Sequence, residues 1–178
     1  MPDHIDLQIL SLIQESSRIT NVEIARNLKM APSAVLERIR KLRAQKIIEE
    51  HVTRLNPAAL GMGLLAFVFV KTNENRSKWD VGQMLSRIPE VLEVHDVAGE
   101  DCYVVKLRTR DTDSLFELLR DKFGKIPAIG STRTTIVLRT VKETTKLPVE
   151  TAAGFRDTGG KIRGKRVARR RRQPGSSG

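Results

Sequence analysis

The sequence predicts an α+β protein in which a small helical domain precedes a β-α-β-β-α-β domain and a basic tail. Three observations lead to this prediction. Apolar residues recur at helical spacing between residues 5 and 45, and strand-like and helix-like segments alternate between residues 64 and 141. The residues from Glu150 onward are rich in Arg, Gly and Thr and carry few apolar side chains. With 178 residues, 39% of them hydrophobic, the chain is long enough for two small domains.

Three short helices are expected in the first part. The first has the i, i+4, i+7, i+8 spacing of one buried face, formed by Ile5, Ile9, Leu12 and Ile13. The second begins at the capping box Thr20-Asn21-Val22-Glu23, whose two outer side chains satisfy backbone amides at a helix start. An apolar stripe follows this box at Ile24, Ala25 and Leu28.

A third helix is expected to begin at Ala31-Pro32, since proline suits the first helical turn. Its buried face has i, i+4, i+7 spacing at Val35, Ile39 and Leu42. Three short helices with a tight turn between the last two outline a helix-turn-helix. We assign this domain to residues 1–48. The stretch IIEEHVTRL, which ends before Asn56-Pro57, is expected to form a strand or wing, within a linking strand or hinge at residues 49–63.

The second domain, residues 64–149, is predicted to have ferredoxin-like order. Its segments are LLAFVFVK (strand), SKWDVGQMLSRI (helix), VLEVHDV (strand), CYVVKLRT (strand), TDSLFELLRDKF (helix) and TTIVLRTV (strand). The first strand is apolar on both faces, with Leu65, Phe67 and Phe69 on one and Leu64, Ala66, Val68 and Val70 on the other. Two helices cover one face only, so we expect a second copy of the chain to cover the other in an obligate dimer.

Charge is concentrated at two places. The net charge is +11, and residues 150–178, which are expected to be disordered, hold nine basic and two acidic residues. A pI near 10.3 indicates a polyanionic partner, nucleic acid before membrane. A basic surface without a partner is the alternative. Between Thr20 and Lys46, seven basic residues stand against two acidic ones.

The exposed side of the third helix is the predicted double-stranded DNA contact. Short side chains at Pro32-Ser33-Ala34 allow a helix to approach the major groove closely, and long basic side chains reach base edges or phosphates. The predicted DNA-binding residues are Thr20, Asn21, Pro32, Ser33, Ala34, Glu37, Arg38, Arg40, Lys41 and Arg43. A solvated helix face is the alternative. A run such as Arg169 to Arg172 has no fixed geometry for reading bases, so the helix is expected to read sequence and the tail to add affinity.

Residues 3–149 resemble the Lrp/AsnC, or feast/famine, family of transcriptional regulators. The resemblance lies in IDLQILSLIQESSRITNVEIARNL, SAVLERIRKLRAQKIIEEHVTRLNPAALG, IPEVLEVHDVAGEDCYVVKLRTRDTDSLFELL and TTIVLRTV. It implies a winged helix-turn-helix followed by a ligand-sensing domain that forms dimers, often assembled into octamers or other rings of dimers. It also implies transcription control by a small effector, frequently an amino acid.

Effector sites of the family lie near a turn often written Gly-x-Tyr-Asp. Here the turn is Gly99-Glu100-Asp101-Cys102, followed by Tyr103; Gly99 matches, Asp101 replaces the Tyr and Cys102 replaces the Asp. These two differences from the family pattern concern recognition of an amino acid and not the fold. Glycine allows backbone amides to approach a carboxylate, and Asp101 or Glu100 offers a partner for an amino group. Hydroxyls of Thr132, Thr134 and Thr135 are further candidates. A plain β-turn is the alternative.

Other classes of protein fit less well. The G-x-G-x-x-A match that begins at Gly61 precedes a strand, so it lacks the strand-to-helix context of a dinucleotide site. His4, His51, His95 and Cys102 are scattered without metal-ligand spacing, and no cofactor is expected. With one cysteine, no signal peptide and no apolar run of about 20 residues, the chain is predicted to be cytoplasmic and nucleoid-associated. We predict a regulator and no enzyme; the alternatives are an architectural DNA-compacting protein and, less favoured by the basic helix, a sirohaem decarboxylase-like enzyme.

Overall fold

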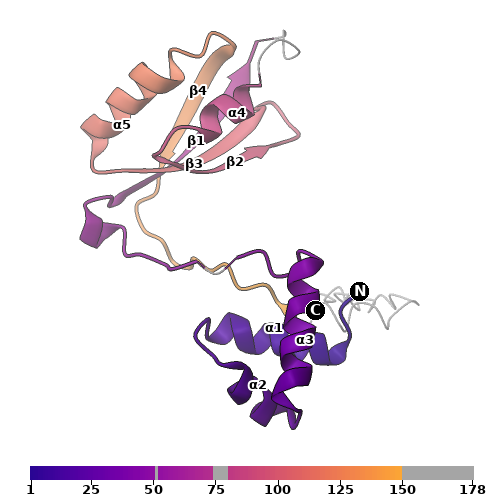
Figure 1. Cartoon of the computed structure of the whole chain (residues 1–178). Coiled ribbons are helices and arrows are strands. Elements are labelled where there is room, and N and C mark those ends of the chain that lie inside the picture. The colour runs from indigo at the N-terminus through magenta and orange to yellow at the C-terminus, as the bar shows by residue number, and fades with distance from the viewer. Residues whose placement is uncertain (51, 74–79, 150–178) are drawn as a thin grey trace, which may run out of the picture. The chain divides into compact units, whose positions relative to one another are not determined.

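The computed structural model describes residues 1–50, 52–73 and 80–149 (Figure 1). The predicted disorder of the basic tail, residues 150–178, lies outside the described residues, as does the start of the helix predicted at SKWDVGQMLSRI. The chain divides into two units, residues 1–52 together with the segment from Thr145 onward, and residues 53–144. The chain therefore passes between the units twice, once after Val52 and again after Thr144.

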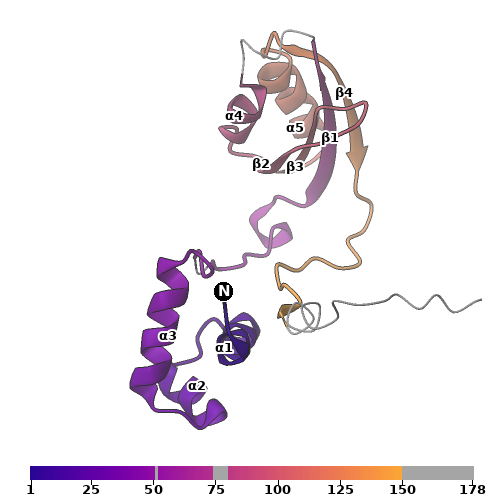
Figure 2. The same ribbon diagram turned by 90° about the vertical axis from the view of Figure 1, so that its right-hand side faces the viewer.

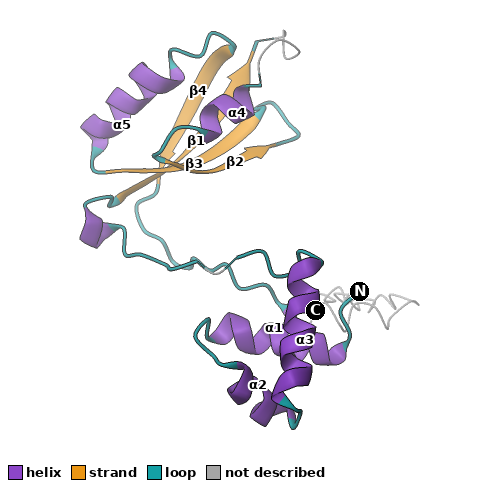
Figure 3. Ribbon diagram, in the orientation of Figure 1, coloured by secondary structure: helices purple, strands orange, loops and turns teal. Residues whose placement is uncertain are grey.

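The first unit contains the three predicted helices, α1 (His4–Glu15), α2 (Asn21–Leu28) and α3 (Pro32–Ala44) (Figure 3). The capping box is confirmed: the Glu23 amide donates to Thr20 Oγ1 at 3.2 Å, and the Thr20 amide donates to Glu23 Oε2 at 2.7 Å. The buried core consists of Ile9, Ile24, Ala25, Val35, Ile39 and Leu42. The other apolar residues of α1 that the spacing predicted, among them Ile5 and Leu12, are half-buried against this core.

The strand or wing expected at residues 47–55 is wrong for the described part of this stretch, which contains no strand. The amides of Ile47 and Ile48 instead donate to the carbonyl oxygen of Leu42, at 2.9 and 3.3 Å, and so finish the last turn of α3. Ile48 packs against the helical core. Ile47 and Ile48 therefore belong to the end of a helix, and among the described residues no strand pairs with this stretch.

The second unit confirms the predicted β-α-β-β-α-β order (Figure 2). Its elements are β1 (Leu64–Thr72), α4 (Val81–Ser86), β2 (Val91–Asp96), β3 (Tyr103–Thr109), α5 (Thr112–Leu118) and β4 (Ile129–Ile136), with a 3-10 turn at Ala58–Leu60 and a π-helical turn at Leu119–Phe123. The strands form one antiparallel sheet in the order β2-β3-β1-β4.

The last strand begins and ends five residues before the predicted bounds. Its register explains the difference, because Ile129 lies opposite Thr72 and Ile136 lies opposite Ala66. The length of β1 thus decides which residues of the threonine-rich stretch join the sheet.

Both helices cover one face of this sheet (Figure 2). The strand residues of that core are Ala66, Val68, Val70, Val105 and Leu107, and the helices add Val81, Leu85, Leu115 and Leu118. The opposite face, which we call the open face, carries Phe67 and Phe69, both half-buried within the single chain. Residues paired across antiparallel strands point to the same face, so Lys106, opposite Phe67, also lies on the open face.

Candidate functional site

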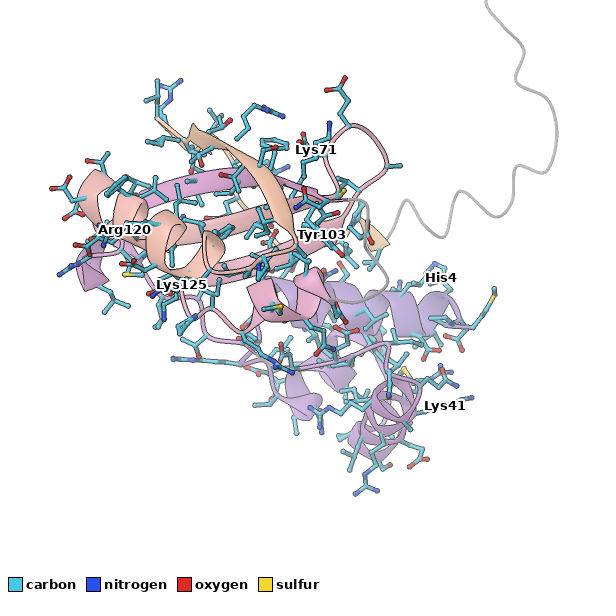
Figure 4. The ribbon with its side chains drawn as sticks, turned by 90° about the horizontal axis from the view of Figure 1, so that it is seen from above. His4, Lys41, Lys71, Tyr103, Arg120 and Lys125 are labelled. Carbon is cyan, nitrogen blue, oxygen red and sulfur yellow. The ribbon has the colours of Figure 1, made fainter. Side chains whose placement is uncertain are left out.

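The side of α3 predicted to contact DNA is exposed. Ser33, Glu37 and Lys41 follow one another at intervals of four residues along this side, and all three are exposed. Figure 4 shows Lys41 on α3. Ala34, Arg40 and Arg43 are exposed as well. Pro32 is the first residue of the helix, so short side chains stand at its N-terminus as predicted. We call this side of α3 the reading face.

The two predicted residues outside α3 lie at the start of α2. Thr20 is exposed, but its hydroxyl is engaged in the capping box with Glu23, and Asn21 is half-buried. At the start of α3, in contrast, Ala31 provides no side-chain cap. The backbone amides in the first turn of α3 therefore make no hydrogen bond to the side chain of the residue before the helix.

Arg38 has a different environment from its neighbours on α3. Its Nη1 atom lies 2.7 Å from Asp3 Oδ2 and 2.7 Å from Asp6 Oδ1. The Arg38 side chain is 30% exposed and that of Asp6 only 14%. Hydrogen bonds with Asp3 and Asp6 raise the pKa of Arg38, and the backbone amide of Asp6, followed by Arg38, lowers the pKa of Asp3. Arg38 therefore joins α3 to the start of α1.

Opposite charges are separated along the sequence of this unit. Residues 20–46 contain seven basic and two acidic residues. The flanking residues 1–19 and 47–50 contain one basic residue, Arg18, and five acidic ones: Asp3, Asp6, Glu15, Glu49 and Glu50. Positive charge is thus concentrated on the helices that a helix-turn-helix presents to DNA.

The predicted effector turn lies between β2 and β3. Gly99 has a φ of 152°, a conformation that favours glycine. The Cys102 amide donates to the carbonyl oxygen of Val70 at 2.8 Å, which fixes the end of the turn to β1. The hydroxyl of Thr72 lies 3.2 Å from Cys102 Sγ. Glu100 is exposed and Asp101 is half-buried.

Asp101 pairs with a residue that the sequence reasoning missed. Its Oδ2 atom accepts a hydrogen bond from Arg133 Nη2 at 3.0 Å. The Arg133 guanidinium also lies over Phe69, 4.1 Å from the ring centroid, in cation-π contact. These contacts bring together the turn, β4 and Phe69 of β1 on the open face. The available signal was alternation, since Arg133 stands between Thr132 and Thr134 and must point to the opposite face.

The three candidate threonines do not share one face. Thr132 and Thr134 lie opposite Val70 and Val68, on the face that the helices cover. Thr135 lies opposite Phe67 and therefore on the open face with Arg133. Among the predicted threonines, only Thr135 is on the same face as the Asp101–Arg133 pair.

A second group of charges lies on and beside the open face. Lys106 Nζ is 2.9 Å from Glu93 Oε1 and 3.0 Å from Glu143 Oε1. Arg54 and Arg108 also pair with Glu143, at 3.1 and 3.6 Å. Hydrogen bonds with Glu93 and Glu143 raise the pKa of Lys106, and the bond with Lys106 lowers the pKa of Glu143. These pairs hold the segment after β4 to the sheet.

A pocket of about 320 Å³ in the second unit lies away from the predicted effector turn. Its lining includes Glu90, Thr109, Arg110 and Ser114, and none of the predicted effector residues. The Glu90 Oε2 atom is buried there without a hydrogen-bond partner among the described residues. Within the described ranges, no three or more His, Cys, Asp or Glu residues gather as metal ligands, and no helix has the length and apolarity to cross a membrane.

Two family models match the chain. A winged helix-turn-helix DNA-binding model covers residues 2–49, and a model of the Lrp/AsnC ligand binding domain covers residues 65–147. The HTH-type transcriptional regulator FL11 of Pyrococcus horikoshii is 38% identical over 148 residues, which are 83% of this chain and 97% of the relative. The leucine-responsive regulatory protein of Escherichia coli is 34% identical over 153 residues, which are 84% and 92% of the two chains.

Solved structures are similar over the same length. A transcriptional regulator of Neisseria meningitidis in complex with L-methionine has a TM-score of 0.80 and 27% identity, covering 85% of this chain and 99% of that one. The feast or famine regulatory protein of Mycobacterium tuberculosis, also complexed with L-methionine, has a TM-score of 0.76 and 30% identity, covering 82% and 97%.

Proposed function

The chain belongs to the Lrp/AsnC family of transcriptional regulators, and from this membership we propose that its reading face recognises specific sites in double-stranded DNA. The observation that carries the proposal is the exposed side of α3, where short side chains at Ser33 and Ala34 precede Lys41 on the same helix. Short residues let the helix enter the major groove, and the basic side chains then reach base edges or phosphates. Arg40 and Arg43 supply further phosphate contacts.

Arg38 enters this proposal in a positioning role. Its guanidinium is already shared between Asp3 and Asp6, so a base contact requires it to leave two carboxylates. Through its ion pairs with Asp3 and Asp6, Arg38 fixes the orientation of α3 relative to α1. It thereby sets how the reading face is presented to DNA. Lys41, without such a pair at its end of the reading face, is the better candidate for direct contact.

The active form is proposed to be a dimer or a larger assembly of dimers in the cytoplasm, associated with the nucleoid. Support comes from the open face of the sheet, since α4 and α5 cover the opposite face and, among the described residues, leave Phe67 and Phe69 half-buried. Burying these two apolar side chains against a second copy lowers the free energy of both copies. Two helix-turn-helix domains in one dimer then fit DNA half-sites related by two-fold symmetry.

The effector is proposed to be an amino acid that binds at the turn around Asp101. Two similar proteins were solved with L-methionine, and Asp101 and Arg133 together present the two charges that complement a free amino acid. The amino group of the ligand pairs with Asp101 and its carboxylate pairs with Arg133, replacing their mutual bond. With Cys102 where the family pattern has Asp, the acidic residues of the turn are Glu100 and Asp101, and Asp101 is the one that pairs with Arg133.

The test is footprinting on the protein's own promoter region, with the full chain and with residues 1–149, over a series of salt concentrations. Discrete protected sites that survive removal of the tail support a sequence-reading regulator. Featureless protection, or protection that disappears with the tail, supports the architectural DNA-compacting protein that the nine basic tail residues also fit.

A further inference from the structure

A side chain of α1, Gln14, holds the segment that follows the second unit. The Gln14 Nε2 atom donates to the carbonyl oxygen of Leu147 at 3.1 Å, and the Leu147 amide donates to Gln14 Oε1 at 2.7 Å. One amide side chain thus satisfies both backbone groups of one residue that is 133 positions away in the sequence. Glutamine and asparagine alone carry a donor and an acceptor arranged for such a pairing.

The attachment consists of hydrogen bonds to the backbone of Leu147, and apolar packing contributes little to it. The Leu147 side chain is 71% exposed, so it contributes little buried area to the attachment. Ser11 lies one turn before Gln14, and Glu15 follows it directly. Both line a pocket together with Lys146, Pro148 and Val149. Two parallel hydrogen bonds fix both the place and the direction of the segment as it crosses α1.

The attachment decides where the basic tail begins. The described chain ends at Val149, two residues after the clasped Leu147, and residues 150–178 follow with nine basic and two acidic residues. Glu143, which ion pairs hold to the sheet, belongs to the second unit, whereas the segment from Thr145 onward belongs to the first. The clasp therefore moves the origin of the tail to the unit that carries the reading face.

We propose that Gln14 clasps the C-terminal segment on α1 so that the polycationic tail acts on the DNA site that α3 occupies. The proposal rests on the proposed DNA-binding function. The 29 residues of the tail are joined covalently to Val149, so the local concentration of their basic side chains at the bound DNA depends on where the tail starts. A fixed origin on the helix-turn-helix unit keeps its arginines near the phosphates that flank the site.

The experiment compares DNA affinity of the full chain with and without Gln14→Ala, in two tail backgrounds. In the second background, called the charge-reduced tail, Arg169→Ala, Arg170→Ala, Arg171→Ala and Arg172→Ala leave five of the nine basic residues and lower the net charge of the tail from +7 to +3. Gln8→Ala is the matched control, because Gln8 is an exposed glutamine of the same helix. We expect Gln14→Ala to weaken binding severalfold and flatten the salt dependence with the natural tail, and to have a much smaller effect with the charge-reduced tail. Gln8→Ala is expected to change neither.

Hydrogen exchange tests the clasp without DNA. The Leu147 amide is expected to be protected in the full chain, and Gln14→Ala is expected to abolish this protection while the amides of α1 stay protected. An unprotected Leu147 amide in the natural chain, or equal losses of affinity in both tail backgrounds, would overturn the proposal. Loss of all site preference in the natural chain contradicts the proposed function itself, whereas failure of the clasp leaves site preference intact.

Discussion

Arg38 on α3 and Asp6 on α1 form a 2.7 Å ion pair that is partly buried, with 30% of the Arg38 side chain and 14% of the Asp6 side chain exposed. The pair lies beside the reading face and is shared with the more exposed Asp3. Arg38, whose position on α3 predicts contact with DNA, therefore also links α3 to α1. Stability and DNA affinity must be measured separately for each basic residue of α3.

Arg38→Ala and Lys41→Ala are expected to act differently. Arg38→Ala leaves Asp6 without its partner and lowers the free energy of unfolding of the helix-turn-helix unit by about 1 kcal/mol, because the pair is partly exposed. Lys41→Ala leaves stability unchanged and weakens specific binding by about tenfold, roughly 1.4 kcal/mol. Thermal unfolding and DNA titration of both variants check this. A Lys41→Ala variant that binds normally would contradict the assignment of the reading face.

Ala31→Ser is expected to stabilise the start of α3. A serine at this position accepts a hydrogen bond from a backbone amide of the first turn, where Ala31 offers no side-chain acceptor. The gain in unfolding free energy is about 0.5–1 kcal/mol, measured by denaturant titration. The same exchange at the other end of the helix, Ala44→Ser, is the control and gives no gain. Equal effects at both ends would mean that capping is not the cause.

Acid is expected to weaken the second unit through Glu143. The Lys106 ammonium holds the pKa of Glu143 below its ordinary value of 4.5, and Arg108 and Arg54 act in the same direction. A carboxylate with a lowered pKa stabilises the folded state above its ordinary pKa, and this contribution is lost as the pH falls through the lowered value. Glu143→Gln should therefore reduce stability at neutral pH, by less than about 1 kcal/mol, and flatten the acid limb.

Chemical denaturation between neutral pH and pH values below 4.5 measures this effect, with Glu117→Gln on the exposed side of α5 as control. Glu93, which also pairs with Lys106, keeps part of the acid dependence in the Glu143→Gln variant. An acid limb as steep as in the natural chain would show that the Glu143 pairs contribute nothing to folding.

Asp101→Asn is expected to weaken effector binding by tenfold or more. The substitution removes the negative charge that the ligand's amino group requires and leaves the shape of the turn unchanged. Glu100→Gln, one residue earlier and exposed, is the matched control and should leave affinity unchanged. Calorimetric titration with L-methionine and a panel of other amino acids measures both. Equal affinities of the two variants for every ligand that binds would place the effector elsewhere.

Most of the fold was predictable from neighbouring residues. The capping box at Thr20, the buried spacing of Val35, Ile39 and Leu42, and the apolar run of β1 each act over a few residues, so local sequence carries them. The prediction at residues 47–55 failed because a strand also needs a partner strand. Here the amides of Ile47 and Ile48 donate to the carbonyl oxygen of Leu42 instead.

The partners of the functional side chains depended on the tertiary structure. Arg38 meets Asp6 across 32 positions, Asp101 meets Arg133 across 32 positions, and Gln14 meets Leu147 across 133. Local spacing placed Arg38 and Asp101 on the correct helix and turn, yet no period links residues so far apart. Charged and amide side chains pair with whichever complementary group the backbone brings within about 3 Å, and only the packing of helices and the register of strands decide which group that is.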